Sequence, residues 1–247
     1  MLEIKNFSKF YGNKKVVENL SISVQSGDIY GFIGANGAGK TTTIKAIVGI
    51  HDFENGSITI DGHSIKEEPI ICKKMMAYIP DNLDLYEHLT GFQYINFIAD
   101  LFEVSTEMRR ERIQRYGDLF GMTKNLSGMI SSYSHGVKQK TAIISALVHS
   151  PKLLILDEPF VGLDPKATFL LKKIMHECVS EGGAIFFSTH ILDVAEKLCN
   201  KIAVIKNGKI ICSGDTNEVK GNQSLESFFM EVQDYEQNDD FNESSNE

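Results

Sequence analysis

A glycine-rich stretch followed by lysine and threonine is the part of the sequence best suited to chemistry. It lies between an apolar run, 29–33, and a helix-forming run, 42–48, and comprises Gly34, Ala35, Asn36, Gly37, Ala38, Gly39, Lys40, Thr41 and Thr42. Glycines let backbone N–H groups approach phosphates without a Cβ in the way, and the helix adds its positive N-terminal end. We expect Lys40 to reach the β- and γ-phosphates and the Thr41 hydroxyl to ligate Mg²⁺. A strand, this loop and a helix together predict a nucleotide-binding site.

Two further apolar runs end in residues that could act on a bound phosphate. Asp157 and Glu158 follow the run 153–156, and His190 closes the run that begins at 184. Asp157 is placed to bind Mg²⁺, directly or through water, and Glu158 to orient and deprotonate an attacking water. His190 could hydrogen-bond the γ-phosphate or that water. The alternatives are a solvated strand end for the two acids and a structural role for the histidine.

The elements that must position these residues follow an α/β pattern. Fully apolar runs at 29–33, 76–79, 153–157 and 184–187 predict buried parallel strands. Helices are predicted at 42–48, 65–74, from 136 to about 149, 167–179 and 191–199. Because ligands of open α/β sheets lie beyond the carboxyl ends of the strands, all three candidate segments should meet at one edge.

Shorter alternating runs surround this core. Strands at 2–5, 16–17, 20–24 and 57–60, with turns at 11–13, 54–56 and 61–62, predict an antiparallel edge. A terminal hairpin is predicted from 201–206 and 209–213. Tyr11 stands at the end of its strand, where it could stack on a base or be an ordinary strand tyrosine.

Between 90 and 120 the pattern becomes helical, which predicts a helical insertion. Five apolar residues fall on one face of a first helix and should pack against the core: Phe92, Ile95, Ile98, Leu101 and Phe102. Ser105 is the predicted N-cap of a second amphipathic helix that contains Ile113, Tyr116 and Phe120. Contact with a partner protein is the alternative role for exposed members of the aromatic stripe.

Composition limits the function classes. The net charge of −8 argues against a nucleic-acid-binding surface, and seven of the acids lie in 231–247, so the rest of the chain is close to neutral. That acidic segment is predicted to be a solvated, disordered tail. The four cysteines form no C-x-x-C pair and are expected to be free cytosolic thiols. No run approaches about 20 consecutive apolar residues, so any membrane span must come from another chain.

The motifs together resemble the ATP-binding subunit of an ABC transporter over roughly residues 1–220. The resemblance rests on the loop 34–42, Asp157-Glu158, Gly162-Leu163-Asp164 and Ser188-Thr189-His190, in this order and with a helical insertion between the first two. It implies an ATPase cassette at 1–223 with a P-loop NTPase core, a helical subdomain at about 82–150, and an acidic tail at 224–247. It also implies ATP and Mg²⁺ as cofactors.

The resemblance assigns roles residue by residue. Lys40 and Thr41 match the phosphate lysine and the Mg²⁺ ligand, Glu158 the general base, and His190 the switch histidine. Tyr11 matches the aromatic residue that stacks on adenine. Asp164 matches the acidic residue that reaches across a head-to-tail dimer.

Two motifs depart from the family pattern. The signature loop keeps Ser134 and Gly136, but His135 replaces its first glycine and Val137 replaces its glutamine. A Cβ at position 135 makes the tight backbone turn of the family less certain. The other departure is Asp81, where the family has glutamine, and its contact with Mg²⁺ could be direct, bridged by water or absent.

The resemblance also implies partners. A second ATPase subunit, identical or paralogous, would face this one head to tail, and a separate membrane permease would hold both at the cytoplasmic face of the membrane. The relaxed signature favours an exporter, with drugs or antimicrobial peptides as candidate cargo. The alternatives are an importer ATPase, a soluble ABC-type ATPase acting on ribosomes or DNA, and an unrelated P-loop kinase or GTPase.

Overall fold

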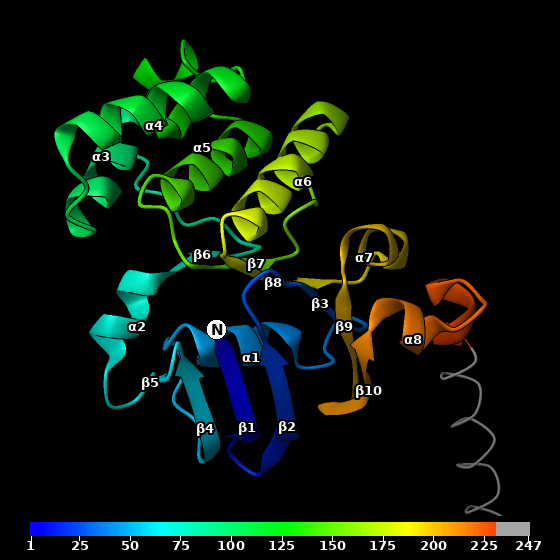
Figure 1. The fold of residues 1–247 in the computed structure, drawn as a ribbon. Helices are drawn as coiled ribbons and strands as arrows, with labels where there is room; N and C mark the ends of the chain where they lie inside the picture. The colour runs from blue at the N-terminus through cyan, green and yellow to red at the C-terminus, as the bar shows by residue number, and fades with distance from the viewer. Residues whose placement is uncertain (231–247) are drawn as a thin grey trace, which may run out of the picture.

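The computed structural model describes residues 1–230, and it contains two β-sheets with helices on both sides of the larger one (Figure 1). The larger sheet has the strand order β10-β9-β3-β8-β7-β6, and every pair in it is parallel except β10 with β9. Its strands are β3 (Ile29–Ile33), β6 (Met76–Ile79), β7 (Leu153–Asp157), β8 (Ala184–Thr189), β9 (Lys201–Lys206) and β10 (Lys209–Asp215). The predicted α/β fold with a mostly parallel sheet is therefore confirmed.

The smaller sheet is antiparallel and has the order β2-β1-β4-β5. Its strands are β1 (Leu2–Tyr11), β2 (Lys14–Val24), β4 (Asn55–Ile60) and β5 (His63–Ser64). Leu2 and Ile4 are buried whereas Glu3 and Lys5 are exposed, so β1 begins with one buried apolar face and one solvent-exposed face. The predicted antiparallel edge is thus present as a separate sheet.

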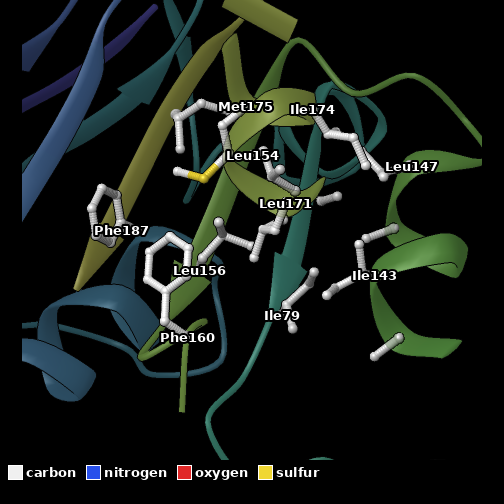
Figure 2. Close-up of a cluster of buried hydrophobic side chains, with 14 of the residues drawn as sticks. Ile79, Ile143, Leu147, Leu154, Leu156, Phe160, Leu171, Ile174, Met175 and Phe187 are labelled. Carbon is white, nitrogen blue, oxygen red and sulfur yellow. The ribbon is translucent and has the colours of Figure 1, made fainter. Parts of the chain in front are cut away.

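The strands of the larger sheet are apolar throughout because both of its faces are covered. In β7, Leu153 and Ile155 point into a core shared with the smaller sheet, while Leu154 and Leu156 point into a second core beneath the helices. Figure 2 shows part of this second core, where Phe160 and Phe187 lie close to Leu156. A continuous apolar run is what this two-sided burial requires.

Helices α1 to α8 pack around the sheets. Their bounds are α1 (Lys40–Ile47), α2 (Pro69–Met75), α3 (Gly91–Leu101), α4 (Thr106–Leu119), α5 (His135–Leu147), α6 (Pro165–Ser180), α7 (Leu192–Leu198) and α8 (Thr216–Lys220). Helix α1 contributes Ile44 and Ile47 to the core between the two sheets. Helices α3, α4 and α5 lie together on the opposite side of the larger sheet, as the predicted helical insertion requires (Figure 1).

Within the insertion, the predicted N-cap is present but the predicted apolar face is only partly buried. Ser105 accepts a hydrogen bond from the backbone N–H of Met108 at the start of α4. Ile95 is fully buried, whereas Phe92 and Leu101 are more than half exposed. The expectation that all five apolar residues pack against the core is therefore wrong for Phe92 and Leu101.

Four local predictions in the N-terminal half are wrong in their bounds. The helix predicted at 65–74 starts only at Pro69, because the backbone N–H of Ile65 bonds to Ile58 in a turn and proline suits the first helical turn. The turn predicted at 54–56 is shorter, since Asn55 already pairs with Ser8 in the sheet. The strand predicted at 2–5 continues to Tyr11, and the runs 16–17 and 20–24 form one irregular strand, β2.

Packing continues beyond residue 223, where the sequence predicts the cassette to end. Asp215 caps α8, and a helical segment follows at 225–230. Leu225 is fully buried, and its backbone N–H donates to the carboxylate of Glu196 on α7 at 2.8 Å. The start of the predicted tail is thus part of the core, and 231–247 lie outside the described residues.

The four cysteines are free thiols. Cys72 and Cys199 are buried, and Cys178 and Cys212 are partly buried. Desolvation raises the pKa of every one of these thiols, that of Cys178 to about 11. Within residues 1–230, no helix combines the length and the apolar content that crossing a membrane requires.

Candidate active site

The glycine-rich loop joins the end of β3 directly to α1. Gly37 and Gly39 adopt left-handed φ values of 83° and 110°, which glycine reaches without strain. A Cβ on Gly34 would lie 2.4 Å from the carbonyl oxygen of Ile205, so only glycine fits this close approach to β9. No side chain caps α1, and the helix dipole favours negative charge at that end. The loop therefore has the backbone geometry of an anion-binding site.

Lys40 is held inside this loop by the loop itself. Its Nζ donates to the carbonyl oxygens of Gly34 at 2.6 Å and Ala35 at 3.3 Å. The same atom lies 3.4 Å from Oε1 of Glu158, and both side chains are nearly buried. Ala38 is buried in the core between the two sheets, which fixes the position of the loop relative to that core. The lysine charge is therefore already placed where a phosphate would need it.

Asp157 lies at the centre of a small oxygen cluster. The Thr41 hydroxyl donates to its Oδ2 at 2.8 Å, and the hydroxyl of Ser188 donates to its Oδ1. Ser188 faces Asp157 because β7 and β8 pair in parallel at these residues. A buried carboxylate beside a hydroxyl at the edge of a phosphate loop fits Mg²⁺, which binds through one or two carboxylates, waters and substrate phosphates.

Glu158 and His190 are in direct contact. Nδ1 of His190 lies 3.0 Å from Oε2 of Glu158, at the ends of β8 and β7. Glu158 has a left-handed φ of 49°, an uncommon value for a residue with a side chain, and its backbone N–H bonds to Ser188. This backbone turn directs the carboxylate back toward the phosphate loop, where it reaches Lys40.

A cavity of about 260 Å³ lies at this edge of the sheet. It is lined by Val16, Asn36, Gly37, Gly39, Lys40, Thr41, Thr42, Asp81 and Glu158. Asp81 thus shares the cavity with the phosphate loop. Val16 is the lining residue that sequence reasoning missed, because a valine in a strand carries no chemical signal.

Other predicted residues lie away from this cavity. Tyr11 is 47% exposed and meets the ring of His51 edge-on, with ring centroids 5.9 Å apart. Ser134 and Gly136 are at the start of α5 and do not line the cavity. His135 is the first residue of α5 and has no left-handed φ, so the backbone there accommodates its Cβ.

Asp164 is engaged within its own chain. Its Oδ1 accepts the N–H of Ala167 and so caps α6, and its Oδ2 lies 2.6 Å from Nζ of Lys140. The hydrogen bond from Lys140 is the main reason why the pKa of this carboxyl lies below its usual value. The site geometry therefore brings together Lys40, Thr41, Asp157, Glu158 and His190, but not Tyr11, Ser134, Gly136 or Asp164.

Comparisons with known proteins agree with the motifs. The family model described as "ABC transporter" matches residues 17–161. The ABC-type transporter ATP-binding protein EcsA of Bacillus subtilis is 36% identical over 220 residues, which cover 89% of each chain. The linearmycin resistance ATP-binding protein LnrL of the same organism is 31% identical over 219 residues, covering 89% of this chain and 70% of LnrL.

A solved structure described as the ATP-binding subunit of an ABC transporter superimposes with a TM-score of 0.91 and 34% identity, covering 94% of this chain and 99% of that one. The matched part spans only 65% and 61% of two uncharacterized ABC transporter ATP-binding proteins from Nostoc and Synechocystis, which are 36% and 35% identical. The family model, the relatives and the fold agree that this chain belongs to the ABC transporter family.

Proposed function

We propose that this chain binds Mg-ATP in the cavity beside the phosphate loop and that its hydrolysis drives export of a substrate through a separate membrane permease. The observation that carries the proposal is the convergence of three strand ends at Glu158, which lines the cavity and contacts both Lys40 and His190. Lys40 follows β3, Asp157 and Glu158 end β7, and His190 ends β8. Residues from three distant segments meet there in the arrangement that phosphoryl transfer to water requires.

Each residue has a role in this proposal. Lys40 would exchange its contacts with the loop carbonyls for the β- and γ-phosphates, and Thr41 and Asp157 would hold Mg²⁺. Asp81 lines the same cavity. When bound, Mg²⁺ neutralises charge that develops on the phosphate oxygens. Glu158 accepts the proton of the attacking water, and His190 fixes the orientation of that carboxylate.

The site needs a second protomer for completion. Ser134 and Gly136 carry the signature motif but do not line the cavity of their own chain. A head-to-tail dimer, homomeric or heteromeric, would bring these residues of one protomer to the nucleotide of the other. Tyr11 is half exposed on the hairpin before the loop, where it is available to stack on adenine.

The helical subdomain offers the contact to the permease. A cavity of about 320 Å³ between α3 and β6 is lined by apolar residues that include Ile50 and Ile98, and by Tyr78 and His149. The buried Tyr78 hydroxyl and His149 Nδ1 have no hydrogen-bond partner within residues 1–230. Ile50 in this lining is more than half exposed, and so is Leu101, the residue before the lining residue Phe102. An apolar cavity with unpaired polar atoms suits a cytoplasmic segment of the permease.

The direction of transport rests on the relatives. LnrL is named for linearmycin resistance. Export is the direction of transport that confers resistance to a toxic compound, so we place this chain among exporters, with drugs or antimicrobial peptides as the cargo class. Its location would be the cytoplasmic face of the membrane, where it binds its permease.

Two measurements test the proposal. The purified chain should hydrolyse ATP only with Mg²⁺, and the tagged chain should co-purify from detergent-solubilised membranes with one polytopic membrane protein. The double variant Ile50→Ser, Leu101→Ser should no longer co-purify with the membrane protein but should still bind ATP. Phe92→Ser, on the same helix as Leu101, should co-purify as the wild type does. Recovery of ribosomes or DNA in place of a membrane protein would overturn the transport assignment.

A further inference from the structure

Helix α5, which begins with the signature motif, is fastened to the loop 159–164 at three points. Nε2 of Gln139 donates to the carbonyl oxygen of Pro159 at 2.9 Å. Nζ of Lys140 lies 2.6 Å from Oδ2 of Asp164. The imidazole of His135 lies so close to the backbone of Gly162 that a Cβ there would be 2.5 Å from Cδ2 of His135. The beginning, middle and end of the loop are therefore all held by one helix.

These contacts differ in exposure. Gln139 is buried and the side chain of Lys140 is 18% exposed, whereas the side chain of Asp164 is 50% exposed. The other carboxylate oxygen of Asp164 caps α6 through Ala167, which restricts its side chain. The ion pair therefore loses less side-chain freedom than a surface pair between two mobile side chains.

The opposite side of the loop is fixed by packing. Phe160 is buried next to Phe187, with ring centroids 5.8 Å apart, and it lies beside Leu156 of β7 in Figure 2. The loop is therefore held between the sheet and α5. Movement of α5 relative to the sheet must displace either this loop or the contacts that hold it.

The loop begins at the residue after Glu158, whose backbone is already in a left-handed conformation. Small shifts of the next residues change the direction of the Glu158 carboxylate, because that strained turn has little room to absorb them. The signature end of α5 and Glu158 are thus connected by the short loop 159–164, of which Pro159 and Phe160 are buried.

We propose that Lys140 and Asp164 are a positioning pair that connects α5, the helix that carries the signature motif, to the loop after Glu158. Together with His135, which packs against Gly162, this pair sets the orientation of the Glu158 carboxylate. The proposal rests on the proposed function. Under it, Asp164 acts on Lys140 of its own chain, and not across the dimer interface as the family resemblance implies. Binding of the signature by a neighbouring nucleotide would then be transmitted to the hydrolytic site of the same chain.

A double-mutant cycle separates these two roles of Asp164. Lys140→Met removes the cation, and Asp164→Asn removes the charge but keeps a side chain that caps helices well. Each variant should lower kcat by about tenfold with little change in the KM for ATP, because a misplaced base slows chemistry without weakening binding. The double variant should be no slower than either single variant. If the fold-decreases in kcat of the two single variants multiply in the double variant, Asp164 acts independently of Lys140 and the proposal is overturned.

Three comparisons complete the design. Lys140→Arg should restore most of the kcat, since it keeps the cation. His135→Ala should also lower kcat, because it removes the imidazole from Gly162. Lys173→Met should leave kcat unchanged, because this lysine lies on the exposed face of α6 with Glu177 3.9 Å away. An inactive wild-type protein would refute the proposed function, whereas an active wild type with a fully active Lys140→Met variant would refute only the positioning pair.

Discussion

Nδ1 of His190 lies 3.0 Å from Oε2 of Glu158, so two residues that are 32 positions apart in sequence form one hydrogen-bonded unit at the cavity edge. The other carboxylate oxygen of Glu158 lies 3.4 Å from Nζ of Lys40. Glu158 therefore touches a histidine on one side and the phosphate lysine on the other. Its carboxylate is positioned by both neighbours before any nucleotide enters.

Replacing His190 by alanine should slow hydrolysis without preventing nucleotide binding. The base would remain, but one of the two contacts that orient it would be lost, so kcat should fall by about 100-fold while ATP affinity changes little. Phosphate release under saturating Mg-ATP and nucleotide titration measure the two quantities. His176→Ala, on the exposed face of α6, is the matched control. An unchanged kcat would show that His190 does not orient the base.

Glu158→Gln should have two opposite effects. Hydrolysis should fall by at least about 100-fold because the amide cannot accept the proton of water. ATP should bind several times more tightly, because a nearly buried carboxylate no longer competes with the phosphates for Lys40. Calorimetric titration with Mg-ATP checks the affinity, and Glu103→Gln at an exposed site serves as the control. Surviving turnover would exclude Glu158 as the base.

Removal of Mg²⁺ with a chelator should abolish hydrolysis, and Thr41→Val should raise the Mg²⁺ concentration needed for half-maximal activity by about tenfold. The valine removes a hydroxyl ligand and also releases Asp157, which accepts from that hydroxyl at 2.8 Å. Activity measured over a range of Mg²⁺ concentrations tests this expectation. Thr106→Val, at an exposed site on α4, should not shift the curve; an equal shift in both variants would contradict the assignment.

His149 should make the fold acid-sensitive. Desolvation, with a smaller effect from the nearby Arg112, lowers the pKa of His149 to about 4, while the unfolded chain titrates near 6.5. The unfolded state therefore binds the extra proton first, and stability is lost as the pH falls from 6.5 toward 4. Urea unfolding should show a loss of about 2 kcal/mol between pH 7 and pH 5 that is absent in His149→Gln. An equal loss in both proteins would assign the acid sensitivity to other groups.

The sequence predicts best where burial is continuous. The bounds of β6 and β7 are as expected, because both faces of these strands are buried and the apolar run therefore has the same length as the strand. The convergence of the three strand ends could be predicted as well, because the carboxyl ends of parallel strands lie at the same edge of a sheet. These features need no knowledge of distant contacts.

Other features depend on partners that are remote in sequence. Leu225 is anchored by Glu196 on α7, which is 29 residues away, so nothing local indicates that the chain is still packed there. Asp164 is paired with Lys140 on another helix, and its availability for a second protomer cannot be judged from the motif alone. Phe92 and Leu101 share a helical face with Ile95, but the fold covers only part of that face.

The raised thiol pKa values have a practical consequence. Since all four native cysteines are at least partly buried and burial raises the pKa of each thiol, we expect them to react slowly with maleimide dyes. A single cysteine introduced at the exposed position of Lys173 would therefore carry a fluorophore without removal of any native thiol. Energy transfer between donor- and acceptor-labelled copies of the otherwise native sequence would then test whether two copies approach each other as nucleotide is added.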